Sequence, residues 1–261
     1  MGAAEEDLRP AVLAADVQDQ RAGAVADANG FARDLLVAAD HALGAAEIDR
    51  VLIDPAGEPA LDALDARLRA DTGLTPPVSY ADVIHDTKRM IADTIQQAEV
   101  ARLVRCLPEP VDGASDALAE LLACFPVYRS SLPAGLGELE HAAAEATARR
   151  PELTEAIQRL MPRLSDPATE VARRFQQTTG PVMAKGVEDT AFYRQTRLGT
   201  LTEVGGDPGV FSISVDGFHR ALAGRHAGWP SSMTTLSTHD TKRGEDVRAR
   251  LSVLAEIPER W

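Results

Sequence analysis

The sequence predicts a mainly α-helical chain with a few short parallel strands in its last third. Alanine and leucine are frequent among its 261 residues and only 4% are aromatic, a composition that favours helices. Between residues 61 and 178, apolar side chains recur at spacings of three or four without a strand pattern. After Gly180, short apolar runs lead into polar loops, as strands do. We therefore divide the chain into an unassigned head (residues 1–50), a helical module (51–179) and a segment with strands (180–261).

The N-terminal part contains few strong signals. The head is rich in alanine and aspartate, and a helix is predicted near residues 31–43, with Gly44 as its stop. The apolar residues 51–53 predict a short buried strand, because a turn with proline and glycine follows them. A helix is then predicted over residues 61–70.

The middle of the chain carries the strongest helical pattern. One helix is predicted over residues 80–107, and Ser115 is expected to cap the next one, which ends near Phe125. Three consecutive helices are predicted after that, over residues 137–150, 151–164 and 166–178. Gly180 and Pro181 are expected to end this run, so the helical module closes there.

The last part is predicted to contain the parallel strands. Residues 181–184 and 233–238 read as strands that end in polar loops, with a helix over 215–223 between them. The charged run 243–250 is expected to form the solvated face of a further helix.

Charge and cysteine content exclude several classes of protein. The formal net charge of −13 argues against nonspecific binding to nucleic acid or to an anionic membrane. No run approaches the roughly 20 apolar residues of a membrane span, and the first ten residues lack a signal-peptide pattern, so we expect a cytoplasmic protein. Cys106 and Cys124 are interpreted as core thiols because they lie at apolar helical positions and lack metal-site spacing.

The pentapeptide His-Asp-Thr-Lys-Arg occurs twice, at residues 85–89 and at residues 239–243. The first copy lies within the strongest helical pattern, which indicates solvated helix surface. The second copy follows the predicted strand 233–238, where a polar cluster is typical of an enzyme site. We therefore treat only the second copy as a candidate for chemistry.

Further polar side chains follow the other predicted strand. The candidate cluster comprises Lys185, Glu188, Asp189, Tyr193, Arg194, His239 and Asp240. Carboxylates flanked by cationic groups suit carbohydrate chemistry, because they bind vicinal hydroxyls and stabilise positive charge at an anomeric carbon. If the two strands end on one face, their loops converge on one cleft.

Long runs in this part resemble the maltooligosyl trehalose synthases. The segments that carry the resemblance are residues 180–194, 203–208 and 237–250, and the runs 54–59 and 125–129 agree with it. It covers residues 51–261 and is dense from residue 180 onward. The resemblance implies an α-amylase-type (β/α)8 barrel enlarged by helical insertions, so that this chain would contain a partial barrel plus a helical insertion.

The resemblance also implies a reaction and residue roles. The family converts the reducing-end α-1,4 bond of a maltooligosaccharide into an α,α-1,1 bond by intramolecular transglycosylation, without a metal or organic cofactor. Asp240 matches the carboxylate that stabilises the transition state, and His239 would bind the same sugar. Lys185 and Glu188 would orient the terminal glucose. Tyr193 and Arg194 are further candidates for substrate binding, although shaping the loop is the stronger interpretation for both.

This sequence departs from the family pattern in one important respect. It contains no segment that matches the family's nucleophile or its general acid, so we expect the chain alone to be inactive. Unpaired strand edges of an incomplete barrel would favour self-association. Two alternatives stay open, namely a noncatalytic helical module that binds a glycan or a partner, and a fragment of an α-glucan hydrolase.

Overall fold

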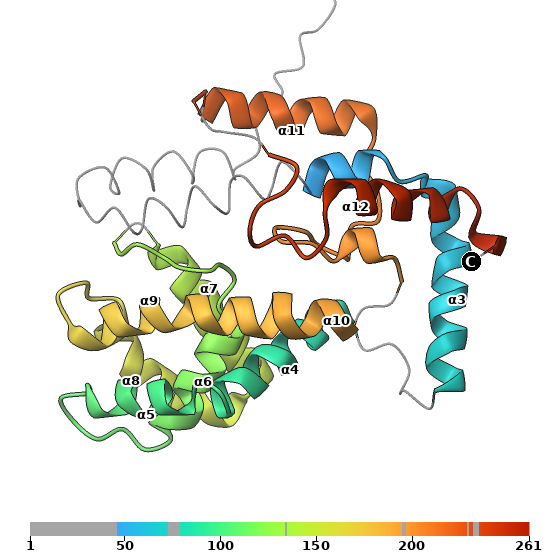
Figure 1. The fold of residues 1–261 in the computed structure, drawn as a ribbon. Helices are drawn as coiled ribbons and strands as arrows, with labels where there is room; N and C mark the ends of the chain where they lie inside the picture. Colours follow the sequence, from blue (N-terminus) through green and yellow to red (C-terminus); the bar gives the residue numbers. More distant parts are fainter. Residues whose placement is uncertain are drawn as a thin grey trace, which may run out of the picture.

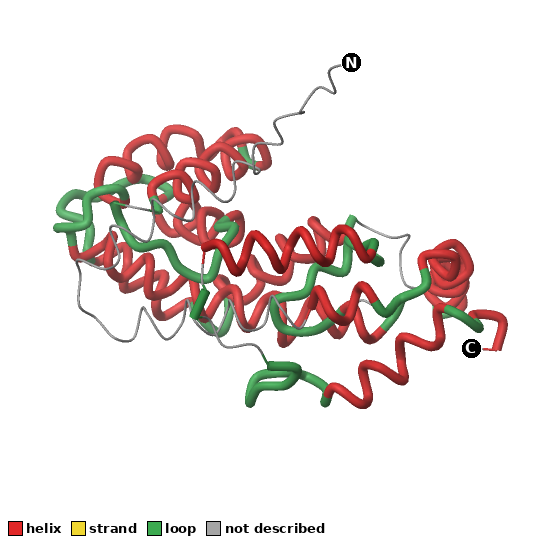
Figure 2. The backbone as a smooth tube through the Cα atoms, turned by 90° about the horizontal axis from the view of Figure 1, so that it is seen from above, coloured by secondary structure: helices red, strands yellow, loops and turns green. Residues whose placement is uncertain are grey.

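In the residues that the structure describes, all regular structure is helical (Figures 1 and 2). The computed structural model describes residues 46–72, 79–133, 135–194, 197–228, 230–231 and 235–260. The α-helices are α3 (Glu58–Asp71), α4 (Tyr80–Asp93), α5 (Gln97–Arg105), α6 (Ala114–Cys124), α7 (Leu136–Arg149), α8 (Thr154–Leu164), α9 (Glu170–Met183), α10 (Phe192–Arg194), α11 (Val215–Gly228) and α12 (Glu245–Ser252). The short helices are η1 (Pro55–Gly57), η2 (Pro151–Leu153), the π-helical η3 (Ala184–Ala191), η4 (Gly199–Leu201), η5 (Val253–Ala255) and η6 (Pro258–Arg260).

The prediction of parallel strands, and with it the partial (β/α)8 barrel, is wrong, because the described residues contain no strand. Residues 181–184 form the last turn of α9 and the first residue of η3. Val182 is buried and follows the buried Thr178 and Thr179 at helical spacing. The apolar run that resembled a strand therefore continues the buried face of a helix.

The other strand predictions fail in a similar way. Residues 46–51 are helical, and a turn follows in which the Ile53 N–H donates to the Arg50 carbonyl (3.3 Å). Residues 235–238 are loop, while residues 233 and 234 lie outside the described residues, as does the helix predicted near 31–43. The unpaired strand edges that motivated self-association are thus not found in the described part of the chain.

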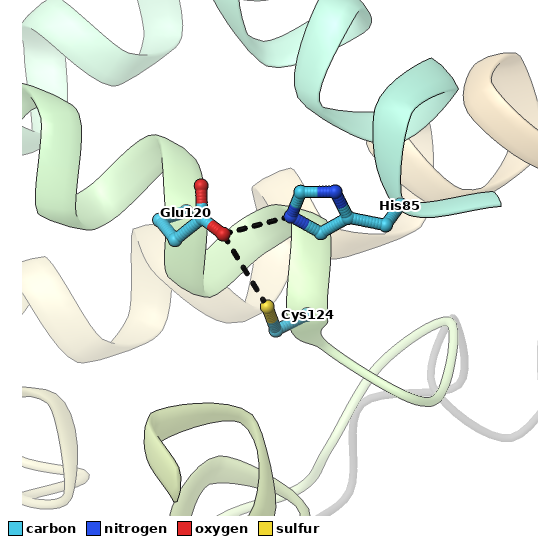
Figure 3. Close-up of side chains that lie close together, drawn as sticks. All are labelled: His85, Glu120 and Cys124. Carbon is cyan, nitrogen blue, oxygen red and sulfur yellow. Dashed lines mark hydrogen bonds and ion pairs between the residues drawn. The ribbon is translucent and has the colours of Figure 1, made fainter. Parts of the chain in front are cut away.

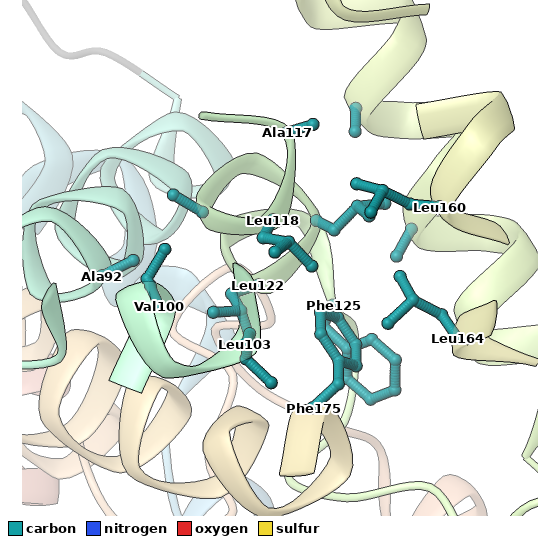
Figure 4. Packing of buried hydrophobic residues seen from close by; sticks show 14 of the residues in the cluster. Ala92, Val100, Leu103, Ala117, Leu118, Leu122, Phe125, Leu160, Leu164 and Phe175 are labelled. Atoms are coloured by element: carbon teal, nitrogen blue, oxygen red, sulfur yellow. The ribbon is translucent and has the colours of Figure 1, made fainter. Parts of the chain in front are cut away.

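Helices α4 to α9 pack around α6, which lies at the centre of the larger hydrophobic core (Figure 4). Leu118, Leu121 and Leu122 of α6 have no exposed surface. Phe125, directly after α6, packs edge-to-face on Phe175 of α9, with ring centroids 5.7 Å apart. Full burial of each such side chain contributes about 2 kcal/mol, so α6 is the helix on which this bundle depends most.

Several predicted boundaries change. The helix predicted over 80–107 is interrupted at Thr94, whose hydroxyl donates to the Met90 carbonyl (2.6 Å) and competes with the helical pattern. Ser115 does not cap α6, which begins one residue earlier without a side-chain cap. The Gly180–Pro181 pair does not end the helical run, because α9, η3 and α10 follow one another directly from Glu170 to Arg194 (Figure 1).

A second, smaller hydrophobic core joins the two ends of the described chain. It comprises Ile53, Leu61, Leu198, Leu201, Phe211 and Ala255. In Figure 1, α3 and α12 lie together on the side away from the α4–α9 bundle. The charged run 243–250 is exposed at most positions, but Arg248 is only 1% exposed, so the expectation of a solvated face is wrong there.

Two simpler expectations concern cysteines and membranes. Cys106 and Cys124 are both free thiols of intermediate burial, which agrees with their interpretation as packed, unpaired cysteines. None of the helices in the described ranges combines the length and the apolar character that crossing a membrane requires.

Candidate functional site

The first half of the candidate site lies on the π-helical segment η3. Glu188 is buried, whereas the Lys185 side chain is half exposed and its ammonium lies 2.6 Å from Asp189 Oδ2. π-Helical turns are rare and occur often at functional sites, because they shift side chains out of the regular helical register. Here the π-helical segment begins directly after α9, without an intervening loop.

The first pentapeptide copy packs directly behind η3. A Cβ atom on Gly186 would lie 2.7 Å from Lys88 Cγ and 2.8 Å from Lys88 Cα, so only glycine fits this approach. Lys88 is 2% exposed and its ammonium donates to the Phe125 carbonyl (2.5 Å), and Thr87 is fully buried. The prediction that this copy is solvated surface is therefore wrong for both residues, although Asp86 is exposed.

The second copy lies in a loop closed by two threonines. The Thr241 hydroxyl donates to the Thr238 carbonyl (2.8 Å), and the Asp240 N–H donates to the Thr238 hydroxyl (3.2 Å). His239 Nε2 lies 3.2 Å from Asp240 Oδ2, and the two side chains are 88% and 57% exposed. Both are thus open to a ligand from solvent.

Lys242 connects this loop to η3. Its ammonium lies 2.7 Å from Asp189 Oδ1 and 3.6 Å from Glu188 Oε2. We call Lys185, Glu188, Asp189 and Lys242 the lysine–carboxylate cluster. The structure thus joins two of the predicted site residues, Lys185 and Glu188, to the loop that carries His239 and Asp240.

The cluster perturbs the ionisation of its carboxyl groups. The pKa of Glu188 is raised to about 7, chiefly by burial and also by the nearby carboxylates of Asp189 and Asp240, against the opposing charge of Lys242. Hydrogen bonds from Lys185 and Lys242 lower the pKa of Asp189. Burial lowers the pKa of Lys242, but its contacts with Asp189 more than offset this effect and raise it overall. At neutral pH, Glu188 can therefore donate as well as accept a hydrogen bond beside an ionised carboxylate.

A buried carboxylate, that of Glu203, accepts hydrogen bonds from the backbone of this loop. Glu203 is 1% exposed and accepts from the backbone N–H groups of Lys242 (2.7 Å) and Arg243 (3.0 Å). The buried Arg248 guanidinium lies 3.8 Å from the same carboxylate and 2.9 Å from Asp49. Sequence reasoning missed Glu203 and Arg248 as parts of the site, although Glu203 opens one of the motif segments.

The remaining predicted residues lie beside the cluster. Tyr193 is exposed and adds to the electrostatic environment of Lys242. The Arg194 carbonyl accepts from the Arg69 guanidinium (3.0 Å), and its own guanidinium lies 3.9 Å from Met90 Sδ. Arg194 thus contacts α3 and α4, and no contact with His239 or Asp240 is seen in the described residues.

This arrangement suits the binding of a polyhydroxyl ligand. Ammonium and carboxylate groups alternate along the cluster, and the exposed His239–Asp240 pair lies on the adjoining loop. Such groups accept and donate hydrogen bonds to vicinal hydroxyls. Among the described residues, the donor atoms close enough to bind a metal ion lie elsewhere, in His85, Glu120 and Cys124.

Comparison with known proteins confirms the family resemblance. No family model matches the chain. Two maltooligosyl trehalose synthases, from the CDC 1551 and H37Rv strains of Mycobacterium tuberculosis, are each 40% identical to it over 220 residues. The chain is thus homologous to part of the maltooligosyl trehalose synthases. The match includes 82% of this chain and 28% of each relative, so the chain spans about a quarter of their length.

A solved maltooligosyl trehalose synthase supports the same assignment. The enzyme from Arthrobacter ramosus is 47% identical, with a TM-score of 0.78, over 85% of this chain and 28% of the solved one. The helical arrangement of this chain therefore has a close counterpart within a maltooligosyl trehalose synthase.

Proposed function

We propose that this chain supplies part of the substrate site of a maltooligosyl trehalose synthase, an isomerase that converts the reducing-end α-1,4 bond of a maltooligosaccharide into an α,α-1,1 bond. The observation that carries the proposal is the 40% identity over 220 residues to curated members of that family. The lysine–carboxylate cluster and the adjoining His239–Asp240 loop supply matching chemistry. We expect the reaction to need no metal or organic cofactor, and the acidic composition suits the cytoplasm.

Each candidate residue receives a role in this proposal. Asp240 binds hydroxyls of the sugar at the cleavage point and stabilises positive charge in the transition state. His239 binds the same sugar from the exposed side of the loop. Lys185 and Glu188 orient the terminal glucose, which must reverse its attachment within the site, while Tyr193 and Arg194 delimit the site on the α10 side.

We propose that the chain does not turn over substrate by itself. A retaining transglycosylation requires a nucleophile and an acid about 5 Å apart. The resemblance assigns only Asp240 to the family's catalytic carboxylates, and its role is neither of these two. The chain is therefore expected to bind maltopentaose without consuming reducing ends, and clear turnover would refute this part of the proposal.

A binding measurement on the intact chain tests the assigned site. Calorimetric titration with maltopentaose should give an affinity that falls about tenfold in Asp240→Asn, because a hydrogen bond to a charged group is lost. Asp86→Asn is the matched control, since it changes the same residue type in the other pentapeptide copy and should leave the affinity unchanged. Equal affinities for both variants and the wild type would place glycan binding outside this loop.

One observation favours the alternative of a noncatalytic helical module. The hydrophobic core of the α4–α9 bundle contains none of the four residues of the lysine–carboxylate cluster. If the module is the functional unit, ligand-induced NMR shifts will map to α4–α9 and persist in Asp240→Asn. Product analysis of the homologous full-length enzyme separates isomerisation from α-glucan hydrolysis, because hydrolysis releases new reducing ends.

A further inference from the structure

Three side chains with metal-binding donor atoms converge between α4 and α6, outside the cluster described above (Figure 3). His85 comes from the first pentapeptide copy on α4, while Glu120 and Cys124 lie one turn apart on α6. His85 Nε2 lies 2.7 Å from Glu120 Oε1, and Cys124 Sγ lies 3.8 Å from the same oxygen. The three donor atoms all lie within 4.8 Å of one another, so one small ion can contact all of them.

We propose that His85, Glu120 and Cys124 bind one zinc ion, with solvent as the fourth ligand. An imidazole nitrogen, a carboxylate oxygen and a thiolate sulfur are the donors that zinc prefers. Zinc–donor distances of about 2.0 to 2.3 Å place tetrahedral donors roughly 3.3 to 3.7 Å apart. The Cys124–Glu120 separation of 3.8 Å needs to close by about 0.1 Å, and the His85–Glu120 separation of 2.7 Å needs to open by about 0.6 Å.

The groups around the three donors form the second layer of contacts that zinc sites require. His85 Nδ1 lies 3.1 Å from Asp86 Oδ1, and metal-binding histidines usually donate their other ring N–H to such a carboxylate. The second oxygen of Glu120 accepts from the Arg89 guanidinium (2.8 Å), which fixes the orientation of the carboxylate. The repeated His-Asp sequence thus supplies both a ligand and its orienting group.

Access and charge determine the kind of site. The His85 side chain is 16% exposed whereas Glu120 is 1% exposed, so an ion reaches the donors from the His85 side. Arg89 and Arg150 flank the Glu120 carboxylate, and the charge of Lys88 acts on Cys124, so these three cations oppose any gain of positive charge. Zinc binds a thiolate and an unprotonated imidazole nitrogen, so binding releases to solvent any proton held by Cys124 Sγ or His85 Nε2. With three protein donors and cations nearby, the site is expected to bind a single zinc ion, and less tightly than a structural site with four protein ligands.

Metal analysis of the intact chain tests the proposal. After dialysis against zinc and removal of free ion, the wild type should retain one zinc per chain, and Cys124→Ser and His85→Ala should each retain much less. Cys106→Ser is the matched control, because it removes the other free cysteine and should leave the zinc content unchanged. Circular dichroism establishes that each variant is folded.

One spectroscopic and one thermodynamic measurement complete the test of the zinc site. Cobalt in place of zinc should give a thiolate-to-cobalt charge-transfer band in the wild type and in Cys106→Ser, but not in Cys124→Ser. Free zinc at 100 times its dissociation constant should lower the unfolding equilibrium constant about a hundredfold. Zinc in the wild-type chain no higher than in a protein-free dialysis blank, or equal zinc in folded Cys124→Ser, would overturn the proposal.

Discussion

The two His-Asp-Thr-Lys-Arg copies have the same sequence and opposite structural roles. In the first copy, Thr87 and Lys88 of α4 are buried, and Lys88 packs on Gly186 of η3 and donates to the Phe125 carbonyl after α6. In the second copy, His239 and Asp240 are exposed on a loop, and only Lys242 reaches back to η3. The two copies meet at η3, because Lys88 packs on Gly186 while Lys242 pairs with Asp189.

The difference shows that the neighbouring elements decide what a short peptide does. A helical backbone turns Thr87 and Lys88 toward the core and leaves Asp86 in solvent. A loop backbone instead exposes the histidine and aspartate, and the buried Glu203 binds the N–H groups that a helix would have satisfied. This contrast implies that substitutions around the two copies differ in their effects on stability and on glycan binding.

Removing the buried carboxylate next to the first copy should have the largest effect on stability. Glu120→Gln deletes a charge that pairs with Arg89 at 2.8 Å and His85 at 2.7 Å. Because breaking a buried pair leaves uncompensated cations, we expect a loss of about 4 kcal/mol in unfolding free energy, measured by urea denaturation of metal-free protein. Asp93→Asn removes an exposed partner of the same Arg89 and should cost less than about 1 kcal/mol. Similar losses in both variants would contradict the contrast in burial.

The second copy should depend on Glu203 in a more local way. Glu203→Gln weakens two hydrogen bonds from the backbone of Lys242 and Arg243, and it removes a charge beside Arg248. We expect a loss of about 3 kcal/mol together with faster hydrogen exchange at the amides of Lys242 and Arg243.

Glu245→Gln is the control for this prediction, because Glu245 is an exposed residue at the start of α12, directly after this loop, and it accepts from the Ser237 hydroxyl. Its denaturation midpoint should match that of the wild type. If exchange at Lys242 is unchanged in Glu203→Gln, the loop does not depend on the buried carboxylate.

Most of the helices were predictable, because their apolar periodicity is local. The helices around residues 61–70, 151–164 and 166–178 were found for this reason. The helix α8 ends where predicted, whereas α9 begins and ends later than the predicted range. The strands were wrong because a run of four apolar residues does not distinguish a strand from the buried end of a helix. At residues 181–184 the decisive fact is the continuation of α9 through Pro181, which local signals would have placed at a helix end.

The candidate site was only partly predictable. Lys185, Glu188, His239 and Asp240 were identified from resemblance and polar clustering. Glu203 and Arg248 were missed because their roles depend on contacts 39 or more residues away in the chain, as in the Lys242–Glu203 bond. The candidate metal ligands were missed for the same reason, because His85 and Glu120 are 35 residues apart and no sequence spacing relates them.

The junction between the two copies should make stability depend on pH. The pKa of Glu188 is raised to about 7 in the folded protein, so folding favours its protonated form. Its stabilising contribution is complete at low pH and is lost as the pH rises through 7. We expect unfolding free energy to fall by roughly 2 kcal/mol between pH 5 and pH 8, at about 1.4 kcal/mol per pKa unit.

Glu188→Gln isolates this effect because it keeps the shape and removes the titration. Its stability should vary less across the same range than that of the wild type. The pKa of Asp189 is lowered, so its contribution is lost only in more acidic solution, below the range of this experiment. An unchanged pH dependence in Glu188→Gln would show that Glu188 is ionised throughout.

The smallest expected change in unfolding free energy comes from replacing the histidine of either copy. His85→Ala in metal-free buffer removes a hydrogen bond to the buried Glu120 and should cost about 1.5 kcal/mol. His239→Ala removes a side chain that is almost fully exposed and should change unfolding free energy by less than about 0.5 kcal/mol. Maltopentaose affinity should show the reverse order, because only His239 lies on the loop proposed to bind the sugar. If both histidines affect stability equally, or if His85→Ala weakens glycan binding more, the assignment of structure to the first copy and of substrate contact to the second is wrong.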